Sequence, residues 1–134
     1  IPFIHAGQEF YRTKGGIYNS YNTPDNINCI NWDFRDIYKD DIDDIKKIIK
    51  LRKNNKCFRY ATREEIEENI LVENIDYKML KYTLKQDSGE YKEFIIYINP
   101  SSFSFDYQEK EYSCIYGNIN DNQIEPKTIV ILAK

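Results

Sequence analysis

The hydrophobic pattern changes at about the middle of the chain, from helical spacing to alternation. Over residues 36–53, apolar side chains recur at Tyr38, Ile42, Ile45 and Ile49, which would place them on one face of a helix. Aspartates fill the first half of this segment and basic residues the second, as the dipole of a helix favours. The pattern therefore predicts a helix over residues 36–53.

A second, shorter helix is predicted at residues 63–68. Thr62 followed three residues later by Glu65 is typical of a capping box, in which each residue satisfies a backbone N–H of the other. After residue 70 the chain is typical of strands, because apolar and polar residues alternate between turn residues. The expected strands are residues 71–74, 77–85, 92–99, 102–107, 111–116 and 127–133.

Short strands at hairpin spacing predict an antiparallel β-sandwich after the helices. We expect its core to hold apolar side chains that follow one another on alternate strand positions. These are Tyr82, Leu84, Phe94, Ile96, Ile98, Ile129 and Ile131.

The segment before the first helix has no periodicity. Residues 1–6 form a short apolar run, and residues 7–32 are rich in the glycine, asparagine and proline that favour turns. Loops of this length are uncommon in compact domains and are usually functional. The function of the chain is therefore expected in this loop.

Length and composition limit the class of protein. The chain has 134 residues, which suits one ordinary domain and is too short for a whole β/α barrel of ~250 residues. It begins with Ile1, and its single methionine is Met79. We therefore expect a piece of a longer protein.

Charge, apolar runs and cysteine spacing limit the partners and the location that we expect for the protein. The net charge is −3 with both signs interspersed, so we expect no nucleic acid partner. The longest uncharged apolar run, residues 94–98, is far too short for a membrane span. Three cysteines without CxxC spacing suggest neither a disulfide framework nor a zinc site, which favours a reducing compartment and a cytoplasmic protein over a secreted one.

Few residues offer catalytic chemistry. His5, the single histidine, lies in an apolar run without an obvious orienting acid, so we expect a buried structural imidazole and no metal site. Glu9 and Asp25 lie in the long loop, and two carboxylates are what glycoside hydrolysis requires. Loop carboxylates also cap turns commonly, and the residues alone favour that interpretation.

The same loop carries side chains that suit a sugar. Amides can bind sugar hydroxyl groups, and an aromatic ring can stack on the face of a sugar. The candidates are Asn19, Tyr21, Asn22, Asn26 and Asn28. Asparagine-rich loops are also common without any ligand, and composition alone favours that interpretation.

The order of residues in the loop adds a family resemblance. The sequence IPFIHAGQEF of residues 1–10 resembles the eighth barrel strand and its exit in the α-amylase superfamily, glycoside hydrolase family 13. The pattern continues with RTKxG at residues 12–16, NSYNxPDxxN at residues 19–28, and Trp32, and it looks like the type I pullulanases, which debranch starch, glycogen or pullulan. The chain departs from that family at Ile17-Tyr18, where polar residues are usual, and also at Cys29 and Asn31.

The resemblance implies an α+β fragment. Residues 1–59 would be the last βα unit of a (β/α)8 barrel, because residues 51–53 and 58–59 resemble its final helix. Residues 60–134 would be an all-β C-terminal domain, an antiparallel β-sandwich, with residues 126–132 similar to its closing strand.

The resemblance also implies roles for residues. The family's nucleophile, acid/base and stabilising carboxylates follow earlier barrel strands, so no catalytic residue is expected in this chain and Glu9 is structural. The long loop would line sugar subsites. Asp25 and Asn28 would contact sugar hydroxyls, supported by Asn19, Tyr21 and Asn22.

The function implied is that of a bacterial α-glucan debranching hydrolase that cleaves α-1,6 glucosidic bonds without a cofactor, this piece alone being inactive. A stand-alone carbohydrate-binding or interaction β-sandwich module is the alternative, favoured if Phe103, Phe105 and Tyr107 face solvent. A third hypothesis is a small complete enzyme that uses His5 or Glu9.

An unpaired apolar segment at residues 1–6 would tend to pair with another surface. We expect Ile1, Phe3 and Ile4 to pack on the apolar face of the helix over residues 36–53, or on a second copy of the chain. The second case would be a self-association without biological meaning.

Overall fold

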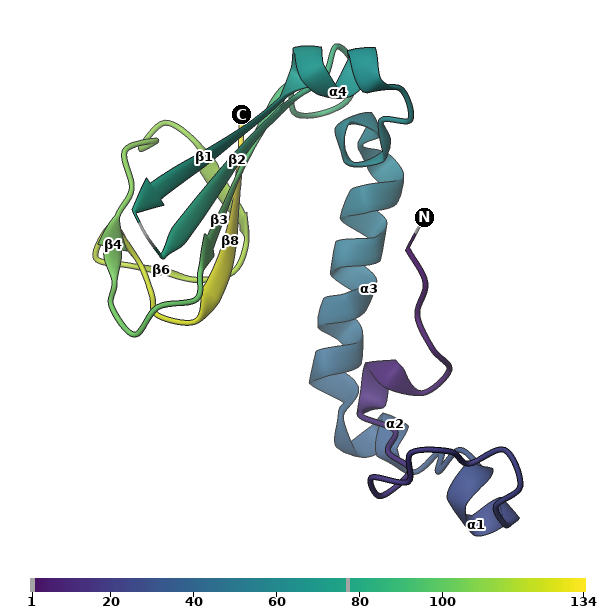
Figure 1. Cartoon of the computed structure of the whole chain (residues 1–134). Coiled ribbons are helices and arrows are strands. Elements are labelled where there is room, and N and C mark those ends of the chain that lie inside the picture. Colours follow the sequence, from purple (N-terminus) through teal and green to yellow (C-terminus); the bar gives the residue numbers. More distant parts are fainter. Residues whose placement is uncertain (1, 77) are drawn as a thin grey trace. The chain divides into compact units, whose positions relative to one another are not determined.

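The computed structural model describes residues 2–76 and 78–134 (Figure 1). The chain forms two compact units, Ile1–Leu51 and Arg52–Lys134. Helices and antiparallel sheets together make an α+β protein, the class that the sequence predicts.

The first unit holds a long loop followed by helices. A 3-10 helix, η1 (Gln8–Phe10), is followed by α1 (Asp25–Asn28), α2 (Phe34–Ile37) and α3 (Lys39–Asn54), of which residues 39–51 belong to this unit. The helix predicted over residues 36–53 is confirmed for most of its length. The prediction is wrong at the beginning of this helix. There the backbone of Tyr38 (φ −107°, ψ 34°) leaves the helical region and separates α2 from α3.

Two short helices begin the second unit, η2 (Lys56–Arg59) and α4 (Arg63–Asn69). The predicted capping box at the beginning of α4 is confirmed. The N–H of Glu65 donates to Thr62 Oγ1 at 3.2 Å, and the Glu65 carboxylate accepts from the N–H of Thr62 at 3.4 Å.

Two antiparallel sheets complete the second unit. The larger has five strands in the order β1-β2-β3-β8-β5, and Figure 1 shows the first four side by side. The smaller has three short strands in the order β4-β7-β6. The strands are β1 (Ile70–Asp76), β2 (Met79–Lys85), β3 (Glu93–Asn99), β4 (Phe105–Asp106), β5 (Ser113–Tyr116), β6 (Ile119–Asn120), β7 (Gln123–Ile124) and β8 (Thr128–Ala133).

Most predicted strands are confirmed within two residues at their ends, and Tyr77 lies outside the described residues. The strand predicted over residues 102–107 is wrong except for β4. The carbonyl oxygen of Phe103 accepts a hydrogen bond from Asn99 Nδ2 (2.8 Å), and the N–H of Phe103 donates to Ser101 Oγ (3.1 Å), which holds this stretch as a turn. The sequence analysis missed β6 and β7, which are too short to show alternation.

The predicted core is only partly right. Leu84, Phe94 and Ile131 are buried, whereas Ile129 is 45% exposed and Tyr82, Ile96 and Ile98 are half-buried. The main buried cluster uses the opposite face of the sheet: Met79, Ile95, Tyr97, Tyr107, Ile124, Val130 and Leu132. Phe105 and Ile119 of the small sheet pack against this cluster. The small sheet therefore covers the face of the large sheet that carries the cluster.

Two of the three residues in the aromatic row that would favour a stand-alone binding module are covered by the rest of the second unit. Tyr107 is buried in the core cluster, and Phe105 is half-buried against it. Phe103 is the one member of the row that is exposed, at 63%. These side chains therefore form no flat aromatic surface.

The residues before α4 belong with the sheet. Gln86 Nε2 donates to Asn55 Oδ1 (3.0 Å), and the N–H of Cys57 donates to Gln86 Oε1 (3.3 Å). The Phe58 ring packs edge-on against Phe94 with centroids 5.2 Å apart. The structural units therefore divide after Leu51. The division at residues 59 and 60, which concerns domains of a longer protein, stays a prediction.

Candidate functional site

The long loop of the first unit is folded around the side chain of Asn28. Asn28 Nδ2 donates to the carbonyl oxygens of Ser20 (2.9 Å) and Thr23 (3.0 Å) and to Thr23 Oγ1 (3.0 Å). Asn28 Oδ1 accepts from Lys14 Nζ at 3.0 Å, and the same ammonium donates to Ser20 Oγ. These bonds connect three stretches of the loop and brace it from the inside.

A second brace holds the loop to the segment before it. The guanidinium of Arg12 donates to the backbone carbonyl oxygens of Asn28 and Ala6. Gly7 permits this arrangement, because its φ is 87° and a Cβ at this position would lie 2.8 Å from Arg12 Cβ. A side chain at Gly7 would therefore displace Arg12.

The outer side of the loop carries the other predicted sugar contacts. Asn19, Tyr21, Asn22 and Asp25 are all exposed. Asn19 Oδ1 accepts from the N–H of Tyr21 at 3.1 Å, which orders the turn between them. Among the described residues, none donates a hydrogen bond to the Asp25 carboxylate, so its oxygens are open to solvent.

The structure thus separates Asn28 from the other four candidates. Asn28 is half-buried and both its N–H groups are used within the loop, whereas Asn19, Tyr21, Asn22 and Asp25 face outward. The sequence analysis did not identify Lys14 and Thr23 as supports of the loop. The spacing of these residues carries no signal for that role, because the contacts depend on the fold of the loop.

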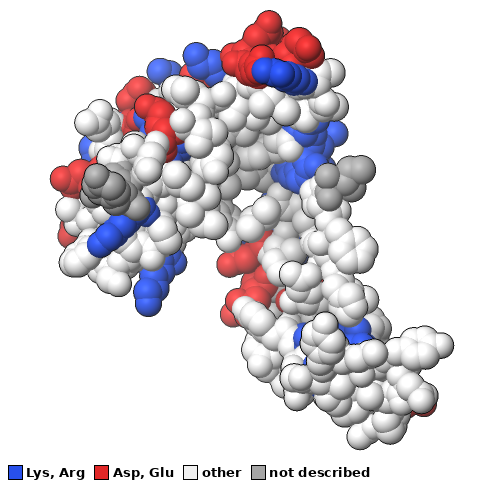
Figure 2. All heavy atoms as spheres, viewed as in Figure 1, with Lys and Arg blue, Asp and Glu red and all other residues white. Residues whose placement is uncertain are grey.

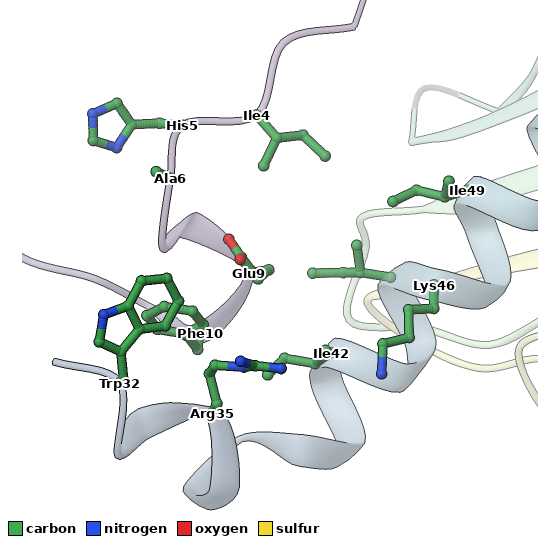
Figure 3. A pocket seen from close by; sticks show the side chains of 11 residues that line it. Ile4, His5, Ala6, Glu9, Phe10, Trp32, Arg35, Ile42, Lys46 and Ile49 are labelled. Carbon is green, nitrogen blue, oxygen red and sulfur yellow. The ribbon is translucent and has the colours of Figure 1, made fainter. Parts of the chain in front are cut away.

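Beside this loop, a hollow of about 390 Å³ lies between residues 4–10 and one face of α3 (Figure 3). Its apolar lining is Ile4, Ala6, Phe10, Trp32, Ile42, Ile45 and Ile49, and its polar lining is His5, Glu9, Arg35 and Lys46. Figure 3 shows the ring of His5 directed away from α3.

The expected packing of the N-terminal segment is only partly present. Ile4 lines the hollow together with the predicted apolar face of α3. Phe3 is 87% exposed, so the prediction that Phe3 packs on the helix of the same chain is wrong. Ile1 lies outside the described residues. Pairing with a second copy stays a prediction.

His5 is exposed, so the prediction of a buried imidazole is wrong. Residues 2–6 form no strand in the structure. The N–H of His5 donates to Gln8 Oε1 at 3.2 Å. Within residues 2–76 and 78–134, no group of three His, Cys, Asp or Glu side chains could hold a metal ion.

Charged side chains are distributed unevenly over the described surface. Figure 2 shows few of them around the part of the molecule that Figure 1 labels α1. On α3, Lys46 pairs with Asp43 at 2.7 Å, and this hydrogen bond lowers the pKa of the Asp43 carboxyl. On the face that Figure 2 shows, the surface around α1 is therefore largely uncharged, which suits a neutral ligand better than an ionic one.

The three cysteines of the chain differ in exposure: Cys57 is buried, and Cys29 and Cys114 are exposed. Cys29, Cys57 and Cys114 are all free of disulfides. Cys57 is buried, and burial raises the pKa of its thiol to about 11, which keeps it protonated at neutral pH.

None of the helices in the described part of the chain is long and apolar enough to cross a membrane.

Comparison with curated proteins finds a bacterial relative. The chain is 34% identical over 110 residues to the pullulanase of Bacillus subtilis strain 168, a match that covers 81% of this chain and 15% of the relative. This chain therefore spans only a small part of the length of that relative. No model of a protein family matches the chain.

Solved structures give the same result. A pullulanase from Anoxybacillus sp. LM18-11 aligns with all of this chain at a TM-score of 0.89 and 26% identity, covering 21% of that structure. The type I pullulanase of Bacillus subtilis strain 168, solved with maltose, aligns with 99% of this chain at a TM-score of 0.88 and 28% identity, again covering 21% of that structure. The chain is therefore a C-terminal fragment of a pullulanase-like protein.

Proposed function

We propose that this chain is part of an α-glucan debranching hydrolase that cleaves the α-1,6 glucosidic bonds of pullulan, starch or glycogen. Its similarity to pullulanases in sequence and structure supports this function. In the proposal, residues 1–59 contribute the last βα unit of a (β/α)8 barrel and residues 60–134 form a β-sandwich after it. The reaction would use two carboxylates of the longer protein in a retaining mechanism, without a cofactor.

The contribution of this chain would be to bind the glucan. One observation carries this assignment: the braces inside the loop leave the amides of Asn19 and Asn22 and the carboxylate of Asp25 facing solvent. Groups held in place before binding lose little conformational entropy when a ligand arrives. Tyr21 would add an aromatic ring to the same surface, and Asn28 would act chiefly by holding the loop.

The solved relatives support an α-glucan ligand. Their complexes contain maltose in the Bacillus subtilis protein and maltotetraose in the Anoxybacillus protein. A bacterial source is consistent with these relatives. Three free cysteines are consistent with a cytoplasmic location.

A binding titration tests the proposal. Maltotetraose is added to the isotopically labelled chain, and the dissociation constant is obtained from NMR chemical-shift changes of residues 13–28. We expect saturable changes with maltotetraose and none with the β-linked cellotetraose. Asp25→Ala should weaken binding, whereas Asp33→Ala, which removes an exposed carboxylate of the same unit outside this loop, should not.

A reducing-sugar assay tests the catalytic part. The chain alone should release no reducing ends from pullulan, because the carboxylates of the reaction would lie elsewhere in the longer protein. Turnover that is abolished by Glu9→Gln would contradict the proposal and favour a small complete enzyme. Saturable binding without turnover would agree with it.

A further inference from the structure

Two tyrosine rings stand out on the loop because the protein leaves them uncovered. Tyr18 is fully exposed and Tyr21 is 94% exposed. Other aromatic residues of the first unit contact one another, such as Tyr11 with Tyr38, whose ring centroids are 4.8 Å apart. Within the described residues, the rings of Tyr18 and Tyr21 make no such contact.

The backbone on both sides of Tyr18 is nevertheless tied down. Before it, the N–H of Ile17 donates to the carbonyl oxygen of Lys14 at 3.2 Å. After it, Asn19 Oδ1 accepts from the N–H of Tyr21, and Ser20 Oγ accepts from the Lys14 ammonium. Tyr18 is therefore an apolar ring presented on a braced turn.

A pyranose ring has hydroxyl groups at its edge and C–H groups on its faces. Amides such as those of Asn19 and Asn22 suit the edge, and a flat aromatic ring suits the face. Tyrosine supplies such an area with only two side-chain torsions to restrict, so ordering it on binding costs little.

We propose that Tyr18 is a stacking residue that covers the face of one glucose unit of an α-1,4-linked glucan. The proposal rests on the function proposed above and adds a contact to its binding loop. This contact would strengthen the hold of the loop on the glucan.

The experiment compares Tyr18→Leu with Tyr18→Phe in the maltotetraose titration. Leucine keeps an apolar side chain without the flat ring, and phenylalanine keeps the ring without the hydroxyl. We expect Tyr18→Leu to weaken binding about three- to tenfold, the range of aromatic stacking, and Tyr18→Phe to change it less than about twofold. Phe103→Leu, at an exposed ring of the other unit, is the matched control and should leave binding unchanged.

Each outcome decides between the two proposals. If Tyr18→Leu binds as the original chain does while Asp25→Ala binds weakly, the stacking role is refuted and the binding function stands. Equal losses in Tyr18→Leu and Tyr18→Phe would show that the hydroxyl and not the ring makes the contact. If the original chain binds no maltotetraose, both proposals fail. The melting temperature should be equal in all Tyr18 variants, because the side chain is fully exposed and no described residue makes a ring contact with it.

Discussion

Asn99 offers a stringent test of the hydrogen-bond network in the second unit. The residue is only 1% exposed. Its Nδ2 donates to the carbonyl oxygens of Phe103 (2.8 Å), Glu125 (2.9 Å) and, at 3.4 Å, Ile124. Its Oδ1 accepts from the N–H of Ser101 (3.1 Å) and from Ser101 Oγ (2.7 Å). One side chain thus connects the end of β3 to two turns.

The substitution Asn99→Asp keeps the shape of this side chain and changes its chemistry. The oxygen that replaces Nδ2 would face carbonyl oxygens that it cannot bond as an ion. Two short hydrogen bonds are lost and their acceptors remain buried, so we expect the free energy of unfolding to fall by about 2–5 kcal/mol. That is a large part of the ~5–15 kcal/mol by which a domain is stable.

The loss should also depend on pH. Burial and the facing carbonyl oxygens would raise the folded-state pKa of the introduced carboxyl above its unfolded value of about 3.9. Below that value the carboxyl is neutral in both states and one O–H can still donate. As pH rises through the raised pKa, ionisation favours the unfolded state, so the variant should lose further stability.

Urea unfolding at pH 4 and pH 8, followed by circular dichroism, measures both effects. Asn118→Asp serves as control, because Asn118 is exposed in the same unit and its substitution should change little at either pH. The reasoning is refuted if Asn99→Asp is as stable as the original chain at pH 8. It also fails if the loss is the same at both pH values.

Other predictions concern packing and charge. A Cβ at Gly117 (φ 81°) would lie 2.3 Å from the carbonyl oxygen of Ile129, so Gly117→Ala should cost more than about 1 kcal/mol, measured by urea unfolding. Leu132→Ala should cost about 2–5 kcal/mol and Ile129→Ala much less, since only Leu132 is fully buried; equal losses would contradict the assigned core. Burial opposes ionisation of Glu109, but hydrogen bonds, the largest from Lys81, outweigh it and lower the Glu109 pKa. The original chain should therefore lose stability as pH falls from the unfolded pKa of about 4.3 through this lowered pKa, and acid titration of Glu109→Gln should show less of that loss.

Local features were predictable from the sequence because they depend on neighbouring residues. The capping box of Thr62 and Glu65 and the apolar face of α3 both arise from spacings of three or four residues. The break at Tyr38 was not predictable, since the apolar spacing continues through it. The spacing of apolar residues indicates which side chains can share a face of a helix. It does not indicate a local change in backbone conformation.

The covered face of the large sheet depends on distant parts of the chain. Residues 94–98 are apolar on both faces of β3, so alternation alone cannot tell which face is the core. The choice follows from the small sheet, whose residue Ile124 packs with Ile95 and Val130. That sheet consists of strands of two residues each, which leave no pattern to detect.

The loop shows how one residue type can serve opposite purposes. Asn19, Asn22 and Asn28 look alike in the sequence, yet the amide of Asn28 is turned inward to carbonyl oxygens five and eight residues earlier in the chain. With both N–H groups used, Asn28 could meet a sugar hydroxyl only through the remaining lone pair of Oδ1, as an acceptor beside the Lys14 ammonium. A sugar contact at Asn28 would therefore be added to the brace and could not replace it. Any role for Asn28 in binding the glucan consequently depends on the same hydrogen bonds that hold Asn19 and Asn22 outward.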